Sequence, residues 1–146
     1  MAENTQTSDM RKLASASNPL QVVQNPIVVN TSLGVLAAYW ARKTAYTQRR
    51  DIFGWADRKN GRVVYWEVGE DGKPIVDKVG KDGKLIPGKK HQDAYTNRIL
   101  FNLAGVVLGT LLINNTLIED ATADYIGLGV AAGSFANLIM TIFQID

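Results

Sequence analysis

The sequence contains no cysteine and one histidine, His91, among its 146 residues. Without cysteine there is no disulfide framework, no Cys-based zinc or iron–sulfur site and no thiol nucleophile. A single histidine leaves no His cluster for a metal. We also find no Ser/His/Asp set, no phosphate-binding loop and no carboxylate pair within an apolar segment. The sequence therefore predicts no metal, cofactor, small-molecule substrate or catalytic residue.

Basic residues are missing from the last third of the chain. Of the 16 Lys and Arg residues, 14 lie between Arg42 and Arg98, and the 48 residues from Ile99 to Asp146 contain none. The overall composition does not reveal this uneven distribution of charge, because 46% hydrophobic residues and a mean hydropathy of -0.06 are ordinary for a soluble domain. Surface positions of a soluble domain normally carry charges of both signs. The segregation indicates that this segment is not surrounded by water.

Two uncharged stretches fill that segment, 99–118 with 20 residues and 125–145 with 21 residues. Twenty helical residues rise about 30 Å, the thickness of the hydrocarbon core of a bilayer. The connection over 119–124 is so short that two helices must form an antiparallel hairpin. Thr122 or Asp124 is placed to cap the second helix. The sequence predicts a transmembrane helical hairpin over 98–146.

A shorter uncharged stretch, 26–41, precedes the basic region. Asn25 followed by Pro26 is typical of a helix start. Extension to a membrane span requires polar residues, so we expect a marginal first transmembrane helix over 20–46. Residues 1–19 are polar and predict a flexible tail.

Aromatic and basic residues alternate where this first helix ends. Such mixtures are typical of lipid headgroup regions, where ring bodies are buried and polar tips stay wet. The residues that we expect at the interface are Trp40, Arg42, Lys43, Arg49, Arg50 and Trp55.

Residues 47–97 form a basic extramembrane loop with an internal repeat. VGEDGKPI at 68–75 and VGKDGKLI at 79–86 match at six of eight positions. Each copy contains an Asp-Gly turn, and Asn60-Gly61 is a third turn of this kind. We expect a two- or three-stranded antiparallel β-meander over about 62–86, too small to bury its own core. The apolar residues that would form its interaction surface are Val64, Tyr65, Trp66 and Ile75.

The two hairpin helices each carry a G-x-x-x-G motif, which allows close approach of a second helix in a membrane. The predicted helix-packing residues are Gly105 and Gly109 in the first helix, and Gly129 and Gly133 with the neighbouring Ala132 and Ala136 in the second. They would pack within the hairpin or between protomers.

The charges predict an orientation. Residues 43–97 carry 12 basic and 8 acidic side chains, a net +4, whereas 119–124 carry three acids. By the positive-inside rule the loop over 43–98 is cytoplasmic and the acidic connection is outside. Three spans place the N-terminus outside, and two spans place both termini inside. Attraction to anionic lipid accounts for the basic loop, so we expect no nucleic-acid partner.

Together these features predict a membrane all-α protein with a small β insert and two or three transmembrane helices. We expect membrane lipid as a partner, with a homo-oligomer or a multi-protein membrane complex as the assembly. The function predicted is that of a non-catalytic structural or assembly subunit of a bacterial inner-membrane complex of the secretion or conjugation type. The alternatives are a pilin-like filament or virion membrane subunit, and a small pore or holin-like protein.

Overall fold

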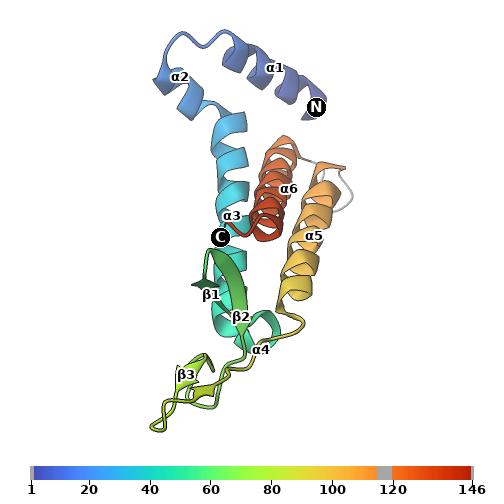
Figure 1. Ribbon diagram of the computed structural model, residues 1–146. Helices are drawn as coiled ribbons and strands as arrows, with labels where there is room; N and C mark the ends of the chain where they lie inside the picture. The colour runs from blue at the N-terminus through green and yellow to red at the C-terminus, as the bar shows by residue number, and fades with distance from the viewer. Residues whose placement is uncertain (1, 115–119, 146) are drawn as a thin grey trace.

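The computed structural model describes residues 2–114 and 120–145, and Figure 1 shows their arrangement. Glu119 of the predicted acidic connection lies outside the described residues. In chain order the elements are α1 (Ala2–Ala14), α2 (Pro19–Gln24), α3 (Pro26–Gln48), α4 (Arg50–Phe53), β1 (Trp55–Lys59), β2 (Arg62–Trp66), β3 (Lys78–Val79), β4 (Leu85–Ile86), α5 (Ala94–Ile113) and α6 (Ala121–Ile142).

The three long helices form a bundle with α6 in the middle. α6 packs extensively against both α3 and α5, whereas α3 and α5 scarcely contact each other (Figure 1). α5 and α6 form the C-terminal hairpin of long apolar helices that the sequence predicts. The predicted fold class is confirmed to this extent: the described chain is mostly helical, with a small antiparallel β part and this hairpin.

Local sequence explains where α3 and α6 begin. Asn25 is the N-cap of α3, since its side-chain oxygen accepts a hydrogen bond from the Ile27 amide at 2.9 Å, and Pro26 occupies the first turn. The N-cap of α6 is Asp120, which accepts from the Thr122 amide at 3.4 Å. The cap is therefore not Thr122 or Asp124, the residues expected from the sequence, because both lie within the first turn of the helix.

The N-terminal residues differ from the flexible tail expected over 1–19. Residues 2–14 form α1, and α2 follows after a short connection. Asn25 donates a hydrogen bond from its side-chain amide to the Asp9 carbonyl oxygen at 2.9 Å, which ties α1 to the start of α3. This tertiary contact stabilises a helix that its polar sequence does not indicate.

β1 and β2 form an antiparallel hairpin that pairs Trp55 with Trp66 and Lys59 with Arg62. The predicted turn between them is confirmed, because Asn60 and Gly61 have φ values of 53° and 77°. Positive φ at both central residues is what a two-residue hairpin loop requires.

The predicted meander over 62–86 is not one sheet. The strand pairing begins before residue 62, because β1 pairs with β2. The residues that follow the Asp71-Gly72 turn do not form a regular strand beside β2. Pro74 lies in that segment and makes only an isolated bridge with Val68. Proline has no N–H to donate to a β ladder, which explains the interruption. β3 and β4 form a separate two-stranded sheet of two residues each.

The two copies of the sequence repeat have the same turn geometry. The Gly69 amide donates to the Lys73 carbonyl at 3.0 Å, and the Gly80 amide donates to the Lys84 carbonyl at 2.8 Å. Gly72 and Gly83 have positive φ values of 75° and 78° in the two turns. The predicted turns are therefore present, although the strands that flank them are shorter than expected.

The β strands lie at one end of the bundle, and α1 and α2 lie at the other (Figure 1). The C-terminal end of the described chain reaches the β strands: Arg58 of β1 donates a hydrogen bond to the Ile145 carbonyl at 2.9 Å. The basic loop therefore lies at one end of the three helices, and Asp120 and Asp124 lie at the other, where α6 begins.

Candidate functional site

The outer faces of the three long helices are apolar and exposed. Val107 of α5 is 58% exposed, and Phe135 of α6 is 55% exposed. The other large apolar side chains exposed on these faces include Leu33, Leu36 and Trp40 of α3, Leu100, Leu103 and Leu108 of α5, and Leu128, Ile139 and Ile142 of α6. Among the described residues, α5 and α6 are the two helices long and apolar enough to cross a membrane; α3 is not one of them.

Polar side chains share the buried positions of the same bundle with small residues and with Tyr46, Tyr125 and Leu138. Asn102, Ser134, Asn137 and Thr141 are all buried, and Thr141 is completely inaccessible. Asn102 donates to the Tyr46 hydroxyl at 2.9 Å, and Thr141 donates to the Asn137 carbonyl at 3.0 Å. A soluble protein normally has the reverse arrangement, with apolar residues inside and polar residues outside.

Glycines bring α3 and α6 into backbone contact. A Cβ placed on Gly34 of α3 would overlap the carbonyl oxygen of Ile126, and one placed on Gly129 of α6 would overlap the carbonyl oxygen of Thr31. One turn further along, a Cβ on Gly133 would lie 3.1 Å from the Cα atom of Val35. No larger side chain fits at Gly34 or Gly129 without separating the helices.

A second set of small residues joins α6 to α5. A Cβ on Gly109 would lie 2.5 Å from the Gly127 carbonyl oxygen and 2.5 Å from the Ala131 amide nitrogen. Gly105 faces Ser134, whose hydroxyl a Cβ at position 105 would overlap. α6 therefore presents small residues on two sides, one to each neighbour.

The predicted packing residues are thus divided between two contacts. Gly105 and Gly109 lie against α6, whereas Gly129 and Gly133 lie against α3 rather than against the first motif. Ala132 and Ala136 are exposed on the remaining face of α6. Gly34 and Gly127 were not among the predicted packing residues, although both lie within uncharged stretches and Gly127 is two residues from Gly129.

Arg98 joins the helices to the β hairpin and was also missed. It is 4% exposed and donates to the carbonyl oxygens of Phe53 at 2.9 Å and Gly54 at 3.3 Å. Its guanidinium lies over the rings of Tyr46 and Tyr65, at 4.2 Å and 4.6 Å from their centroids. Carbonyl oxygens and ring faces both stabilise a buried cation. The sequence signal was the position of Arg98 as the last basic residue before the apolar hairpin.

The residues expected at the lipid headgroups lie at the β end of α3 and just beyond it. Trp40 and Lys43 are exposed, whereas Arg42 is half-buried and donates to the Asn137 side chain of α6 at 3.0 Å. The Arg50 guanidinium lies 3.8 Å from the ring centroid of Trp55. Of the residues expected at the lipid headgroups, Trp40 and Lys43 are therefore on the surface, whereas Arg42, Arg50 and Trp55 contact other side chains of the protein.

Arg49 forms a bidentate ion pair with Asp51, with N–O distances of 3.1 and 3.0 Å. The guanidinium lowers the pKa of the Asp51 carboxyl, chiefly through this hydrogen bonding, and the pKa of Arg49 is raised for the same reason. Both side chains are well exposed, so the pair adds little stability by itself.

The predicted interaction surface of the loop requires correction. Tyr65 and Trp66 are buried, at 8% and 2% exposure, and Val64 and Ile75 are half-buried. The hairpin uses Tyr65 to pack against the helices through Arg98. The exposed apolar residues of the loop lie instead in the second copy of the repeat and around it, at Val76, Val79, Leu85 and Ile86.

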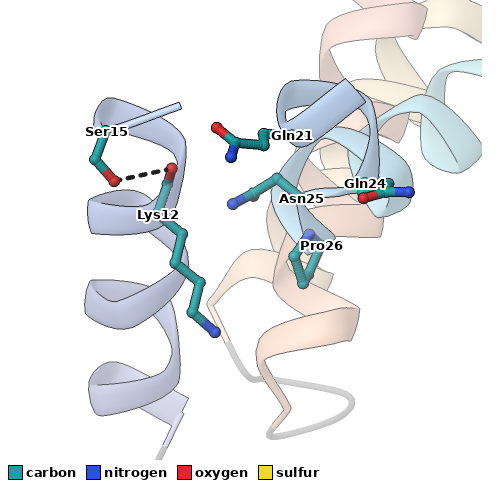
Figure 2. Close-up of a pocket in the computed structure, with 6 residues that line it drawn as sticks. All are labelled: Lys12, Ser15, Gln21, Gln24, Asn25 and Pro26. Carbon is teal, nitrogen blue, oxygen red and sulfur yellow. Dashed lines mark hydrogen bonds between the residues drawn. The ribbon is translucent and has the colours of Figure 1, made fainter. Parts of the chain in front are cut away.

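Several hollows lie on the described part of the chain. An apolar groove of about 490 Å³ runs between α3 and α5, with Ala37, Ala41, Ala104 and Gly105 among its lining residues. A polar cleft of about 420 Å³ lies between α1 and the α2–α3 segment. Figure 2 shows Gln21 and Asn25 directed across this cleft toward α1, which carries Lys12 and Ser15. Searches with the chain find no matching family model, curated protein or solved structure.

Proposed function

We propose that the chain is an integral membrane protein that serves as a non-catalytic structural or assembly subunit of a larger bacterial membrane complex, of the secretion or conjugation type. One observation carries this proposal: the bundle exposes many large apolar side chains and buries several polar ones. Only 17% of the most apolar window of α5 is buried. A core helix of a soluble protein would be covered on most sides, whereas hydrocarbon solvates such a helix favourably.

The arrangement supports three spans. α3 lies along α6, so a bilayer crossed by α6 surrounds α3 as well. The first 16 residues of α3, 26–41, are uncharged, and exposed Trp40 is followed by the cations at positions 42 and 43. Aromatic and basic side chains at that level favour the boundary between hydrocarbon and headgroups.

The proposed orientation places the β hairpins in the cytoplasm and the α1–α2 end outside. The β end carries the basic loop, whereas Asp120 and Asp124 lie at the opposite end of α6. Ile145, one residue before the end of the chain, accepts a hydrogen bond from Arg58 of β1 and therefore lies at the same end of the bundle as the loop. This is the polarity expected from the positive-inside rule.

A structural role is supported by what the buried polar groups do. The Asn102–Tyr46 and Arg42–Asn137 hydrogen bonds join helices to one another inside one protomer. Side chains used in this way hold a bundle together rather than line an aqueous path. The exposed face with Ala132 and Ala136 and the exposed second repeat are the surfaces that we assign to neighbouring subunits.

Purification in mild detergent from the native membrane tests the assembly. We expect a detergent-stable complex with a mass well above that of the monomer, from a homo-oligomer or with other membrane proteins. Recovery in sheared filaments or particles would favour the filament or virion subunit instead. Dye leakage from liposomes containing the pure protein would favour the pore. A monomer with neither behaviour would contradict the proposed assembly role.

A further inference from the structure

The apolar groove between α3 and α5 contains one buried hydroxyl group. Ser134 of α6 lines the groove and is only 4% exposed, and the other nine lining residues are aliphatic, aromatic or glycine. A Cβ atom on Gly105 would overlap Ser134 Oγ, so this oxygen is directed toward a residue of α5 that also lines the groove. The hydroxyl therefore lies on the side of α6 that meets the groove.

No side chain or backbone group among residues 2–114 and 120–145 forms a hydrogen bond with Ser134 Oγ. Other hydroxyls of the same helices differ, since Thr110 and Thr141 each donate to the carbonyl four residues earlier. A buried hydroxyl without a partner is costly, because it has lost its hydration. In a groove with otherwise apolar walls, the missing acceptor has to come from the molecule that fills the groove.

The groove lies next to the level that we assign to the lipid headgroups. Arg42 of α3 donates to the Asn137 side chain at 3.0 Å, and Ser134 precedes Asn137 by three residues, about 4.5 Å along the helix axis. Trp40 lines the groove and is exposed. Lys43 is also exposed and lies one turn beyond Trp40 on the same side of α3. Cations thus lie at the β end of the groove, and the hydroxyl lies about one turn deeper.

We propose that this groove binds one acyl chain of an anionic glycerophospholipid, and that the Ser134 hydroxyl donates to the ester carbonyl oxygen of that chain. The inference rests on the proposed function, since it requires the bundle to lie in a bilayer. A phospholipid carries the required groups in the required order, namely a phosphate for Lys43, an ester carbonyl for Ser134 and a hydrocarbon chain for the apolar walls.

The size and the walls of the groove fit this ligand. Its volume of about 490 Å³ lies within the range of about 300–1,000 Å³ typical of sites for small apolar ligands, which are mostly apolar with a few polar groups. Ala37, Ala41 and Ala104 keep both walls free of large side chains. A single chain can therefore lie between α3 and α5.

Photo-crosslinking tests the site in the full-length protein. The protein is reconstituted into phosphatidylcholine vesicles that contain a small fraction of phosphatidylglycerol with a diazirine on one acyl chain. After irradiation, mass spectrometry of the peptides locates the labelled residues. We expect saturable labelling at Ala41 and Ala104, and labelling that does not saturate at Val107 on the outer face. Unlabelled phosphatidylglycerol should displace the groove label about fivefold better than phosphatidylcholine, the preference expected for one cation near the membrane surface.

Ser134→Ala removes the hydroxyl without adding bulk. We expect the affinity of the groove for the labelled lipid to fall about two- to tenfold, as for the loss of one hydrogen bond. Thr110→Val is the matched control, because it removes an exposed hydroxyl that donates to its own helix. Lys43→Gln should remove the preference for phosphatidylglycerol over phosphatidylcholine.

Ala104→Phe fills the groove and should abolish saturable labelling there, whereas Val107→Phe adds a ring outside the lining residues and should not. If Ala104→Phe does not fold, Ser134→Ala still tests the site, since it leaves the helix contacts in place.

Three results would overturn the inference while the protein remains in the membrane, and these leave the proposed membrane location intact. The first is wild-type protein without saturable labelling in the groove. The second is equal affinity for Ser134→Ala and wild type, which would show that the hydroxyl bonds to its own helix. The third is an unlabelled groove together with a smaller complex for Ala104→Phe, which would assign the groove to a second copy of the chain. Release of the wild-type protein from the membrane would overturn the proposed function and this inference with it.

Discussion

The Cα atom of Gly34 in α3 lies 2.9 Å from the position that a Cβ atom would occupy on Gly129 in α6. The two helices are therefore in backbone contact at this level. On its other side α6 makes a similar approach to α5, where Gly109 meets Gly127. Small residues on both sides of α6 allow it to lie between α3 and α5.

Gly129→Leu should separate α3 from α6, because the new side chain would occupy the space of the Thr31 carbonyl. We expect a loss of stability of at least about 1–3 kcal/mol, as for other overpacked interiors. Thermal unfolding in detergent, followed by circular dichroism, measures it. Val107→Leu is the control, since residue 107 is exposed and the change adds one methylene group outside the helix contacts. Equal melting temperatures for the two variants would contradict this packing.

Arg98→Met should weaken the attachment of the β hairpin. The change removes the donors to the Phe53 and Gly54 carbonyls, and each buried acceptor left unsatisfied costs about 1–3 kcal/mol. Denaturant unfolding followed by tryptophan fluorescence tests this, because Trp66 is buried in the hairpin. Arg62→Met, at an exposed position of β2, should have little effect. If Arg98→Met unfolds at the same denaturant concentration as the wild type, the Arg98 guanidinium is not needed to hold the β hairpin on the helices.

The contact between Asp77 and Lys59 should depend on pH. Lys59 and the Gly88 amide, which donates at 2.6 Å, lower the pKa of Asp77 from its ordinary value of 3.8. Because the folded pKa is lowered, this contact stabilises the fold above the unfolded pKa, and its contribution is lost as the pH falls through the folded pKa. The Gly88 amide resonance should therefore titrate with a midpoint below 3.8.

Asp77→Asn should abolish that titration, whereas Glu70→Gln, at an exposed position of the first repeat, should leave it intact. A Gly88 midpoint at or above the ordinary aspartate value would contradict the ion pair.

The proposed orientation predicts which added cysteines react from outside the cell. The native chain has no cysteine, so a single introduced thiol is the only target. Thr122→Cys should react with a membrane-impermeant maleimide in intact cells, and Lys81→Cys should react only after lysis. Both positions are exposed, so burial does not protect either thiol. The opposite labelling pattern would reverse the orientation.

The hairpin of α5 and α6 could be predicted from sequence because uncharged length is a property of the chain itself. The same holds for the turns at Asn60-Gly61 and the two Asp-Gly pairs, whose φ requirements are local. α1 could not be predicted, since its helix depends on contacts with α6 and with Asn25. The burial of Tyr65 and Arg98 likewise depends on how the hairpin folds back onto the bundle. Patterns within a short segment therefore predict helices and turns. Contacts between segments far apart in the sequence decide which side chains of those helices and turns are buried.

Insertion of the three helices into a bilayer makes Val107 a position sensitive to charge. Val107 is exposed and lies near the middle of the uncharged stretch 99–118, so lysine there is harmless in water but costs about 2.5–3.5 kcal/mol at the centre of a bilayer. Val79→Lys, at an exposed position of β3, is the matched control.

The most direct measurement is the fraction of each protein that stays in the membrane pellet after extraction with alkaline carbonate. We predict that wild type and Val79→Lys remain in the pellet and that Val107→Lys is depleted from it. Release of the wild-type protein into the supernatant, as a folded soluble species, would contradict the account.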